Sequence, residues 1–517
     1  MREVGVIASN ARSFEAPLLI YKEAEPLIKE EALVLVDDVK FRKKYLGVLR
    51  FVVKLDPLLT TTQRSAIIER PEIAEEGIDI PYETSTVRII GEVSGSRVEP
   101  ATTPPTPRSK VYLVEKPEDL LIDLGTGLSI GVHKYSGIEV PMRTDALRYH
   151  IAVVGTTGTG KSRLVKAVID EVIAKTNWNV IVFDHTGMDY APYWPDKTVA
   201  AERVVLDVAT IADGLKACIG TSRELIEEYI PPALAEYVVC EGGNTELCNK
   251  LQSLRQKDTE ERQRGKGLVA TQKTTELPTI ERDVLEALTL EVSSRGGWNA
   301  SKLAIYIARV ALGLGAKATT NFKLTFYLTL YAQHYIRRLN SMRYRVDDLV
   351  DRARRDRLLV VDLSTVETEV RRVIVARFLE RLWEIITERL EPVNTLVVID
   401  EAHNYACYQG CYPASYMVEK TLREGRKWNL GVVLASQRVL DFSPDVRNNV
   451  NTVFFSRLQT PYDFDQLRNF VDLAGIRPET LSLLEAREFF FAGLGNPLKF
   501  PMLIRVREVG DPARVPS

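Results

Sequence analysis

Residues 155–162 have the composition and spacing of a loop that binds the phosphates of a nucleotide. They match the pattern G-x-x-x-x-G-K-[ST] at every fixed position. Glycines let backbone N–H groups face phosphate oxygens, and the N-terminus of a following helix adds partial positive charge. We expect Lys161 to reach the β- and γ-phosphates and Ser162 to be a ligand of Mg²⁺. The residues expected to bind ATP are Gly155, Thr156, Thr157, Gly158, Thr159, Gly160, Lys161 and Ser162.

Two carboxylates, Asp400 and Glu401, directly follow the apolar run Leu396–Ile399. Hydrolysis of ATP requires a metal ligand and a group that orients the attacking water. We expect Asp400 to contact Mg²⁺ through its water shell and Glu401 to polarise the water. The pair favours hydrolysis over transfer to a metabolite, because a metabolite kinase needs a pocket for the phosphate acceptor.

A glutamine and three arginines complete the candidate site. Gln437 follows the apolar run Val432–Ser436, and the carboxyl edge of a parallel sheet is where phosphates lie. We expect its amide to sense the γ-phosphate. Ring ATPases commonly use an arginine from a neighbouring subunit, for which Arg426 is the first candidate, before Arg423 and Arg457. For each arginine, an ordinary place on the surface remains the alternative.

The apolar runs that carry these motifs predict a parallel sheet covered on both faces, as in an α/β nucleotide-binding domain. The expected strands are Ile151–Val154, Val180–Asp184, Leu358–Asp362, Leu396–Asp400, Val432–Ser436 and Val453–Ser456. Residues 370–390 predict a long amphipathic helix. Between about 210 and 350 helical periodicity replaces the strand pattern, which predicts a helical insertion. Within it, residues 255–267 are dense in both signs of charge and predict either a solvated loop or a loop that meets DNA.

The N-terminal region has a different pattern, with short apolar runs over the first ~95 residues that predict a small barrel or sandwich. Four prolines between Glu99 and Pro107 predict a stiff linker. The expected organisation is a β-barrel at 1–98, a linker at 99–109, an ATPase core at 110–209 and 351–505, a helical insertion at 210–350 and a C-terminal tail at 506–517.

Composition limits the possible partners and locations. The 517 residues carry a formal net charge of −2, so any DNA-binding charge must be concentrated in a groove or channel. No apolar run approaches the ~20 residues that span a bilayer, and the first residues lack a secretory pattern. We therefore expect a soluble, cytoplasmic protein without a membrane anchor.

Five cysteines are too few and too scattered for a disulfide scaffold. Cys407 and Cys411 lie shortly after His403, but a zinc site would need a fourth ligand that the sequence does not indicate. Free thiols or a local disulfide are therefore favoured over zinc at these two positions.

Together, these motifs resemble the HerA/FtsK branch of RecA-like ATPases, and the HerA family in particular. The resemblance is carried by Ile130–Val132, Arg148–His150, Gly155–Ser162, Asp184–Tyr190, Asp400–His403, Arg423–Lys427 and Ala435–Arg438. It implies a homohexameric ring that hydrolyses ATP with Mg²⁺, moves along double-stranded DNA and works with a NurA-type nuclease docked through the barrel end. It also implies Gln437 as the sensor and Arg426 as the arginine acting on the neighbouring subunit. Asp189 stands where the family usually has glutamate.

Two other functions share parts of this pattern. A related ring ATPase in conjugation, secretion or genome packaging would use the same catalytic residues, although the absence of an apolar spanning run disfavours a membrane-anchored coupling protein. A nucleotide-binding regulator of a nuclease would need no turnover, and the intact pair of Asp400 and Glu401 argues against it.

Overall fold

The computed structural model describes residues 1–56, 81–219, 223–253, 280–313, 317–439, 442–469 and 471–511. The charged segment 255–267 lies outside these ranges. The chain forms two compact units. Unit 1 comprises Met1–Trp178, Asn394–Tyr408 and Glu419–Asp511, whereas the described part of unit 2 comprises Asn179–Val393 and Gln409–Val418. None of the described helices is long and apolar enough to cross a membrane.

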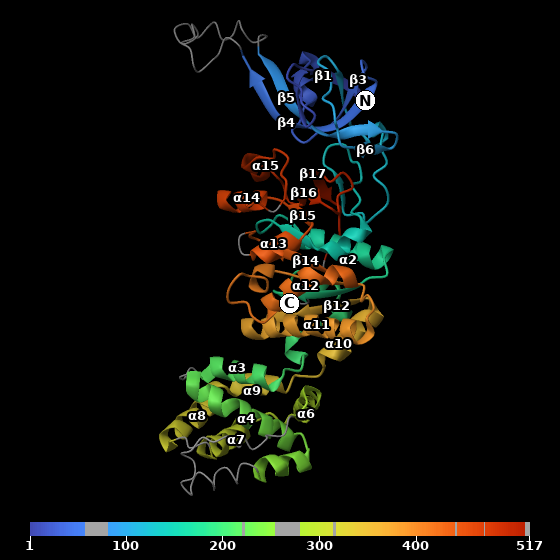
Figure 1. Ribbon diagram of the computed structural model, residues 1–517. Coiled ribbons are helices and arrows are strands. Elements are labelled where there is room, and N and C mark those ends of the chain that lie inside the picture. Colours follow the sequence, from blue (N-terminus) through green and yellow to red (C-terminus); the bar gives the residue numbers. More distant parts are fainter. Residues whose placement is uncertain are drawn as a thin grey trace, which may run out of the picture. The chain divides into compact units, whose positions relative to one another are not determined.

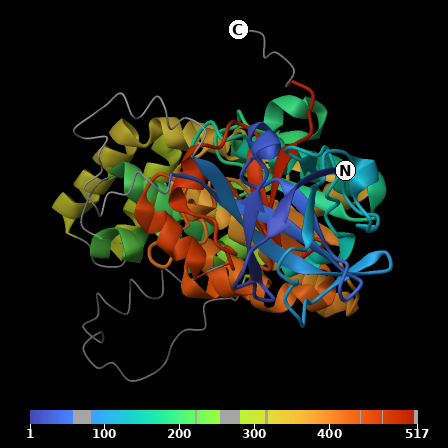
Figure 2. The same ribbon diagram turned by 90° about the horizontal axis from the view of Figure 1, so that it is seen from above.

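A closed barrel of six antiparallel strands forms the N-terminal part of unit 1 (Figure 1; Figure 2, blue strands). Its strands are β1 (Arg2–Ile7), β2 (Glu15–Ile20), β3 (Leu33–Asp38), β4 (Lys43–Leu55), β5 (Tyr82–Ser94) and β7 (Lys110–Leu113). They follow the order β2-β1-β7-β3-β4-β5, and β5 pairs with β2 to close the barrel, while β6 (Arg97–Glu99) extends β5. The expected barrel is confirmed, and it includes one strand from beyond the proline-rich segment.

Unit 1 also contains the strands that carry the candidate site. Four of them, β13 (Thr395–Ile399), β14 (Leu430–Ser436), β9 (Ile151–Val154) and β15 (Thr452–Phe455), run parallel in this order. Every residue of these four strands is buried, as expected for parallel strands covered on both faces. Beyond β15 the sheet continues antiparallel through β16 (Glu488–Gly493), β17 (Met502–Val506) and β8 (Gly131–His133). This antiparallel extension was not among the expected strands.

Helices connect the strands of unit 1 along the chain. The phosphate-loop candidate leads into α2 (Lys161–Lys175). Three short helices, α13 (Pro444–Asn449), α14 (Pro461–Arg468) and α15 (Pro478–Ser482), each begin with a proline, whose fixed φ suits the first turn of a helix. The helix α12 (Ala414–Glu424) precedes β14 in the chain.

The described part of unit 2 contains three parallel strands and a group of helices. The strands β11 (Thr198–Ala200), β12 (Leu358–Asp362) and β10 (Asn179–Asp184) lie in this order. The expected long helix is confirmed as α11 (Thr368–Arg389). The other helices are α3 (Val208–Ile219), α4 (Arg223–Glu241), α6 (Arg282–Ser294), α7 (Ala300–Gly313), α8 (Ala318–Tyr331), α9 (Gln333–Leu339) and α10 (Val346–Asp356).

Two buried histidines connect segments of unit 1. The Nε2 of His133 in β8 lies 2.9 Å from the carbonyl oxygen of Glu31, and its Nδ1 lies 2.8 Å from the Ser136 hydroxyl. The Nδ1 of His150, just before β9, accepts a hydrogen bond of 3.2 Å from the N–H of Val432 in β14. Burial lowers the pKa of both imidazoles from 6.5 to about 4.

These histidines predict a loss of stability below pH 6.5. Between pH 6.5 and 4 the unfolded chain binds more protons than the folded chain, so stability must fall as pH falls through this window. Each histidine is expected to lower the free energy of unfolding by about 2 kcal/mol at pH 5 relative to pH 7. Thermal midpoints measured from pH 7 to 4.5 should fall less steeply in His133→Gln and His150→Gln than in the wild type. The exposed His334→Gln is the control, and parallel curves for all four proteins would contradict the prediction.

Candidate functional site

The phosphate-loop candidate has the backbone shape that its glycines predict. It begins after the buried strand β9 and ends in the first turn of α2. Gly158 and Gly160 have φ angles of 81° and 94°, in the left-handed region that residues with side chains rarely adopt. Gly160 is the N-cap of α2, so the loop presents a helix N-terminus to whatever it encloses.

Two segments outside the motif hold this loop through backbone hydrogen bonds. The N–H of Thr156 donates to the carbonyl oxygen of Arg457, after β15, over 2.8 Å. The N–H of Arg487, just before β16, donates to the carbonyl oxygen of Thr159 over 2.8 Å. A Cβ on Gly160 would lie 3.2 Å from the backbone nitrogen of Arg487, so the two segments pack closely. Sequence reasoning missed Arg487, and it considered Arg457 only for its side chain.

The side chains at the start of α2 lie over the loop. The Lys161 ammonium donates to the carbonyl oxygens of Gly155 and Thr156, over 2.8 and 3.2 Å. Ser162 is half-buried in the first turn of α2. Thr159 is fully buried, and its hydroxyl donates to the carbonyl oxygen of Thr156 over 2.8 Å.

A chain of polar contacts joins the loop to the end of β13. The Thr157 hydroxyl donates to the side-chain oxygen of Gln437 over 3.2 Å. The Gln437 amide nitrogen donates to Oε1 of Glu401 over 2.7 Å. The other carboxylate oxygen of Glu401 lies 3.2 Å from Nδ1 of His403. The structure therefore brings together three residues that the sequence predicted from separate motifs.

The two candidate carboxylates differ in exposure and backbone conformation. Asp400 is 4% exposed at the end of β13. Glu401 has φ 43° and ψ 49°, a left-handed conformation that costs a residue with a side chain about 1–2 kcal/mol. Such strain is concentrated at functional sites in proteins. The Asp400 carboxylate and the Ser162 hydroxyl offer oxygen donors, which are the ligands that Mg²⁺ prefers.

The three candidate arginines occupy different places. Arg426 is exposed in the 3-10 turn Gly425–Trp428, and its guanidinium lies 5.3 Å from the centre of the Tyr149 ring. Arg423 is exposed in the last turn of α12, whereas Arg457 is half-buried beside the loop. Among the described contacts, none of these side chains belongs to the network of Thr157, Gln437 and Glu401.

The motif Asp184–Tyr190 forms a turn at the end of β10 in unit 2. The Asp184 carboxylate is fully buried and accepts three hydrogen bonds of 2.8–2.9 Å from the N–H groups of Gly187, Tyr190 and Ala191. Burial raises the pKa of Asp184, although these hydrogen bonds favour its charged form. The Asp189 carboxylate accepts a hydrogen bond of 2.9 Å from the Thr186 hydroxyl. The hydrogen bonds to Asp184 and Asp189 thus stabilise the turn that this motif forms.

The structure gives the bonding state of the five cysteines. Cys407 and Cys411 are both disulfide-bonded, as are Cys240 and Cys248, which pair with each other. Cys218 is a free thiol. Neither Cys407 nor Cys411 is therefore a free thiol.

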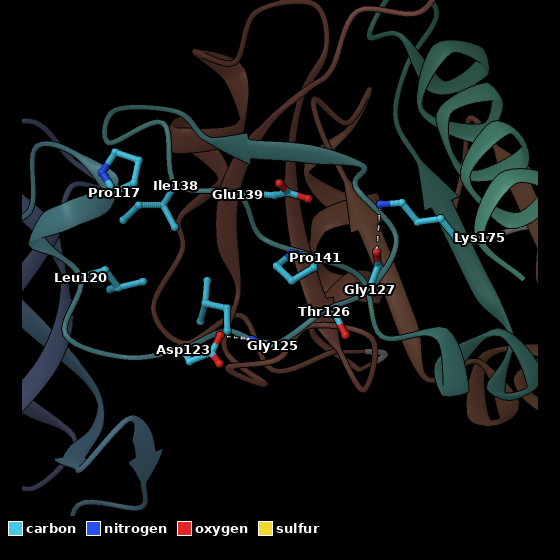
Figure 3. Close-up of a pocket in the computed structure, with 11 residues that line it drawn as sticks. Pro117, Leu120, Asp123, Gly125, Thr126, Gly127, Ile138, Glu139, Pro141 and Lys175 are labelled. Carbon is cyan, nitrogen blue, oxygen red and sulfur yellow. Dashed lines mark hydrogen bonds between the residues drawn. The ribbon is translucent and has the colours of Figure 1, made fainter.

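A surface pocket of about 400 Å³ lies elsewhere in unit 1 (Figure 3). Leu120, Ile138 and Pro141 contribute apolar side chains to it, and the carboxylates of Asp123 and Glu139 lie at its rim. The Lys175 ammonium donates to the Gly127 carbonyl oxygen over 3.2 Å and pairs with Glu171. No phosphate-loop residue lines this pocket, so it is separate from the candidate nucleotide site.

Comparison with known proteins identifies related chains. Residues 128–382 match the family model described as "Helicase HerA, central domain". The chain is 22% identical over 506 residues to the DNA double-strand break repair helicase HerA of Pyrococcus furiosus, covering 89% of this chain and 84% of that protein. It is 21% identical over 516 residues to the HerA of Saccharolobus solfataricus, covering 97% and 92%.

Two solved structures are also similar. VirB4 of Thermoanaerobacter pseudethanolicus is 15% identical with a TM-score of 0.46, covering 74% of this chain and 97% of that one. The bacterial conjugative coupling protein TrwB is 13% identical with a TM-score of 0.42, covering 76% and 91%. The family match lies on the segment that contains the phosphate loop, and the HerA relatives align over most of the chain. Residues 128–382 therefore contain the central domain of the HerA family, and the chain is similar to HerA helicases over most of its length.

Proposed function

We propose that this chain hydrolyses ATP in order to move along double-stranded DNA as a homohexameric ring. The observation that carries the proposal is the contact chain from Thr157 through Gln437 to Glu401. It links the phosphate loop to Glu401, the carboxylate that we expect to polarise water. Gain or loss of a γ-phosphate at the loop can therefore shift Gln437 and, with it, the strand end that carries Glu401.

Each candidate residue has a defined task in this reaction. The Lys161 ammonium exchanges its loop carbonyl partners for β- and γ-phosphate oxygens. Ser162 would be a ligand of Mg²⁺ and Asp400 would contact the ion through its water shell, and the ion would supply charge neutralisation at the phosphates. Glu401 orients and polarises the attacking water, Gln437 senses the γ-phosphate, and Arg426 acts on the nucleotide of the neighbouring subunit.

We infer the DNA substrate and the protein partner from the similarity to HerA proteins. The relatives are named DNA double-strand break repair helicases, and we extend double-stranded DNA and the processing of its ends to this chain. The resemblance to HerA further supports a NurA-type nuclease as the partner. The barrel end of unit 1 is the surface where we place this nuclease.

One preparation can test the proposal in two measurements. Light scattering should give the mass of six 58.2-kDa chains, and linear duplex DNA should increase the rate of ATP hydrolysis at low salt. The stimulation should weaken steeply as salt rises, because phosphate contacts release counterions. Lys161→Ala gives the background rate. The proposal would be wrong if the protein were a monomer and DNA left its rate of ATP hydrolysis unchanged. Co-purification with a secretion component instead of a nuclease would favour the conjugation or secretion alternative.

A further inference from the structure

The turn formed by residues 485–488 contacts the phosphate loop through one of the carbonyl groups of the loop. The N–H of Arg487 donates to the carbonyl oxygen of Thr159 over 2.8 Å. This bond uses no N–H group that the loop could direct to a phosphate oxygen. It is therefore compatible with a bound nucleotide, whereas the Lys161 ammonium would have to leave its carbonyl partners in order to reach the phosphates.

A buried carboxylate, that of Glu488, holds this turn. Glu488 is fully buried at the start of β16. One of its carboxylate oxygens accepts hydrogen bonds from the Lys134 ammonium over 2.8 Å and from the N–H of Glu485 over 3.0 Å. The other accepts a hydrogen bond of 2.9 Å from Arg505 in β17. Burial alone would raise the pKa of Glu488, but these hydrogen bonds lower it, so the carboxylate is charged at neutral pH.

Glu488 also joins the turn to the other segment that holds the phosphate loop. The Ser456 hydroxyl donates to the backbone carbonyl oxygen of Glu488 over 2.7 Å, and both residues are fully buried. The next residue, Arg457, accepts the N–H of Thr156 through its carbonyl oxygen over 2.8 Å. The two segments that hold the loop are therefore bonded to each other at Glu488.

The backbone of Arg487 has an unfavourable conformation where it meets the loop. Its φ angle of 68° lies in the left-handed region, which is disfavoured for residues with a side chain and most of all for β-branched ones. A Cβ on Gly160 would lie 3.2–3.4 Å from the backbone nitrogen, Cγ and Cα of Arg487. The Arg487 guanidinium instead pairs with the 88% exposed Glu508 over 3.3 Å. The contacts of Arg487 with the loop are thus made by its backbone and the carbons nearest to it.

We propose that Glu488 is a positioning residue for nucleotide binding. It holds Arg487 and Ser456 against the phosphate loop, and these contacts keep the loop in the shape that binds phosphates. A loop whose shape is fixed before binding loses less conformational entropy when the ligand binds. The inference rests on the proposed function for the identity of the ligand. It predicts an effect on the affinity for ATP and ADP alike, because the loop encloses phosphates that both contain, and little effect on the chemical step.

The first test changes the backbone preference at Arg487 in the full chain. Arg487→Val should raise the Kd for ADP with Mg²⁺ and the KM for ATP by about tenfold, while kcat stays within about threefold of the wild type. Glycine adopts this conformation freely, so Arg487→Gly should bring the Kd back to within about threefold of the wild type. Calorimetric titration with ADP and Mg²⁺ and steady-state hydrolysis of ATP are the measurements.

Arg357→Val is the matched control for strain. Arg357 has a φ angle of 66° at the C-cap of α10, so valine is as unfavourable there as at Arg487. The control variant should lose a similar amount of thermal stability without a change in the Kd for ADP. This comparison separates the positioning of the loop from a general loss of stability.

The second test changes Glu488 itself. Glu488→Gln keeps the shape of the side chain but removes the charge that faces Lys134 and Arg505, and it should raise the Kd for ADP by about tenfold with kcat little changed. Circular dichroism shows whether this variant folds, and the variants at Arg487 test the inference even if it does not.

Each contrary result has a defined meaning. Wild-type affinity for ADP in Arg487→Val would overturn the inference. Equal losses in Arg487→Val and Arg487→Gly would assign the effect to the guanidinium and also overturn it, as would a fall in kcat at unchanged affinity. Binding of ADP requires neither DNA nor hydrolysis. A wild type that binds ADP but does not hydrolyse ATP would therefore contradict the proposed function alone, whereas one that binds no ADP would contradict both.

Discussion

Glu401→Gln is expected to lower the turnover number for ATP hydrolysis by about 10²–10⁴ while ATP binding is retained. Glutamine keeps the shape of the side chain but removes the charge that polarises water. Its amide oxygen can still accept the hydrogen bond from the Gln437 nitrogen, which is 2.7 Å long in the wild type. The substitution therefore separates the chemical step from the contacts that join the loop to β13.

Single-turnover hydrolysis and equilibrium binding of a fluorescent ATP analogue would measure the two effects independently. Glu424→Gln is the matched control, because it removes an exposed carboxylate in the same unit and should leave both quantities unchanged. Hydrolysis by Glu401→Gln within about threefold of the wild type would remove Glu401 from the catalytic step.

The strands that the sequence predicted well are those with continuous apolar runs. The runs starting at Ile151, Val180, Leu358, Leu396, Val432 and Val453 all became strands, with ends that differ by at most two residues. Burial on both faces imposes this pattern directly, whatever the neighbours of a strand are. The residues of a strand do not show in the same way which other strands it pairs with, because pairing depends on residues far away in the chain.

The barrel and the antiparallel extension are two cases in which the pairing of strands could not be predicted from the sequence. The strand β7 follows a proline-rich segment, and only its pairing with both β1 and β3 assigns it to the barrel. The strands β16 and β17 were not among the expected strands, and their order beside β15 depends on pairing between segments that are distant in the chain. Register and neighbour choice are long-range properties, so a local pattern cannot predict them.

The candidate site likewise has a part that the sequence predicted and a part that it could not predict. Motif spacing selected Thr157, Glu401 and Gln437, and the structure places them in contact. The backbone bonds from Arg457 and Arg487 to the loop could not be predicted, because any residue type can make them. The left-handed conformation of Glu401 is equally invisible in its residue type.

Arg426→Ala is expected to lower the turnover number by about 10³ or more, because an arginine supplied by a neighbouring subunit stabilises charge on the transferring phosphoryl group. Arg426 is exposed and lies against Tyr149, outside the network of Thr157, Gln437 and Glu401 in its own chain. Arg423→Ala is the matched control, since Arg423 is also an exposed arginine in the same segment. Steady-state hydrolysis with saturating duplex DNA is the measurement.

Mixing two inactive variants tests whether the arginine acts between subunits. In a ring, each nucleotide would bind at an interface between two chains, where Glu401 of one chain and Arg426 of the next act together. An equal mixture of Glu401→Gln and Arg426→Ala chains, exchanged before assay, should therefore restore activity at about one interface in four. If Arg426 acted within its own chain, every chain in the mixture would lack one of the two groups and no activity would return. Full activity of Arg426→Ala alone, with a loss in Arg423→Ala, would instead assign the role to Arg423.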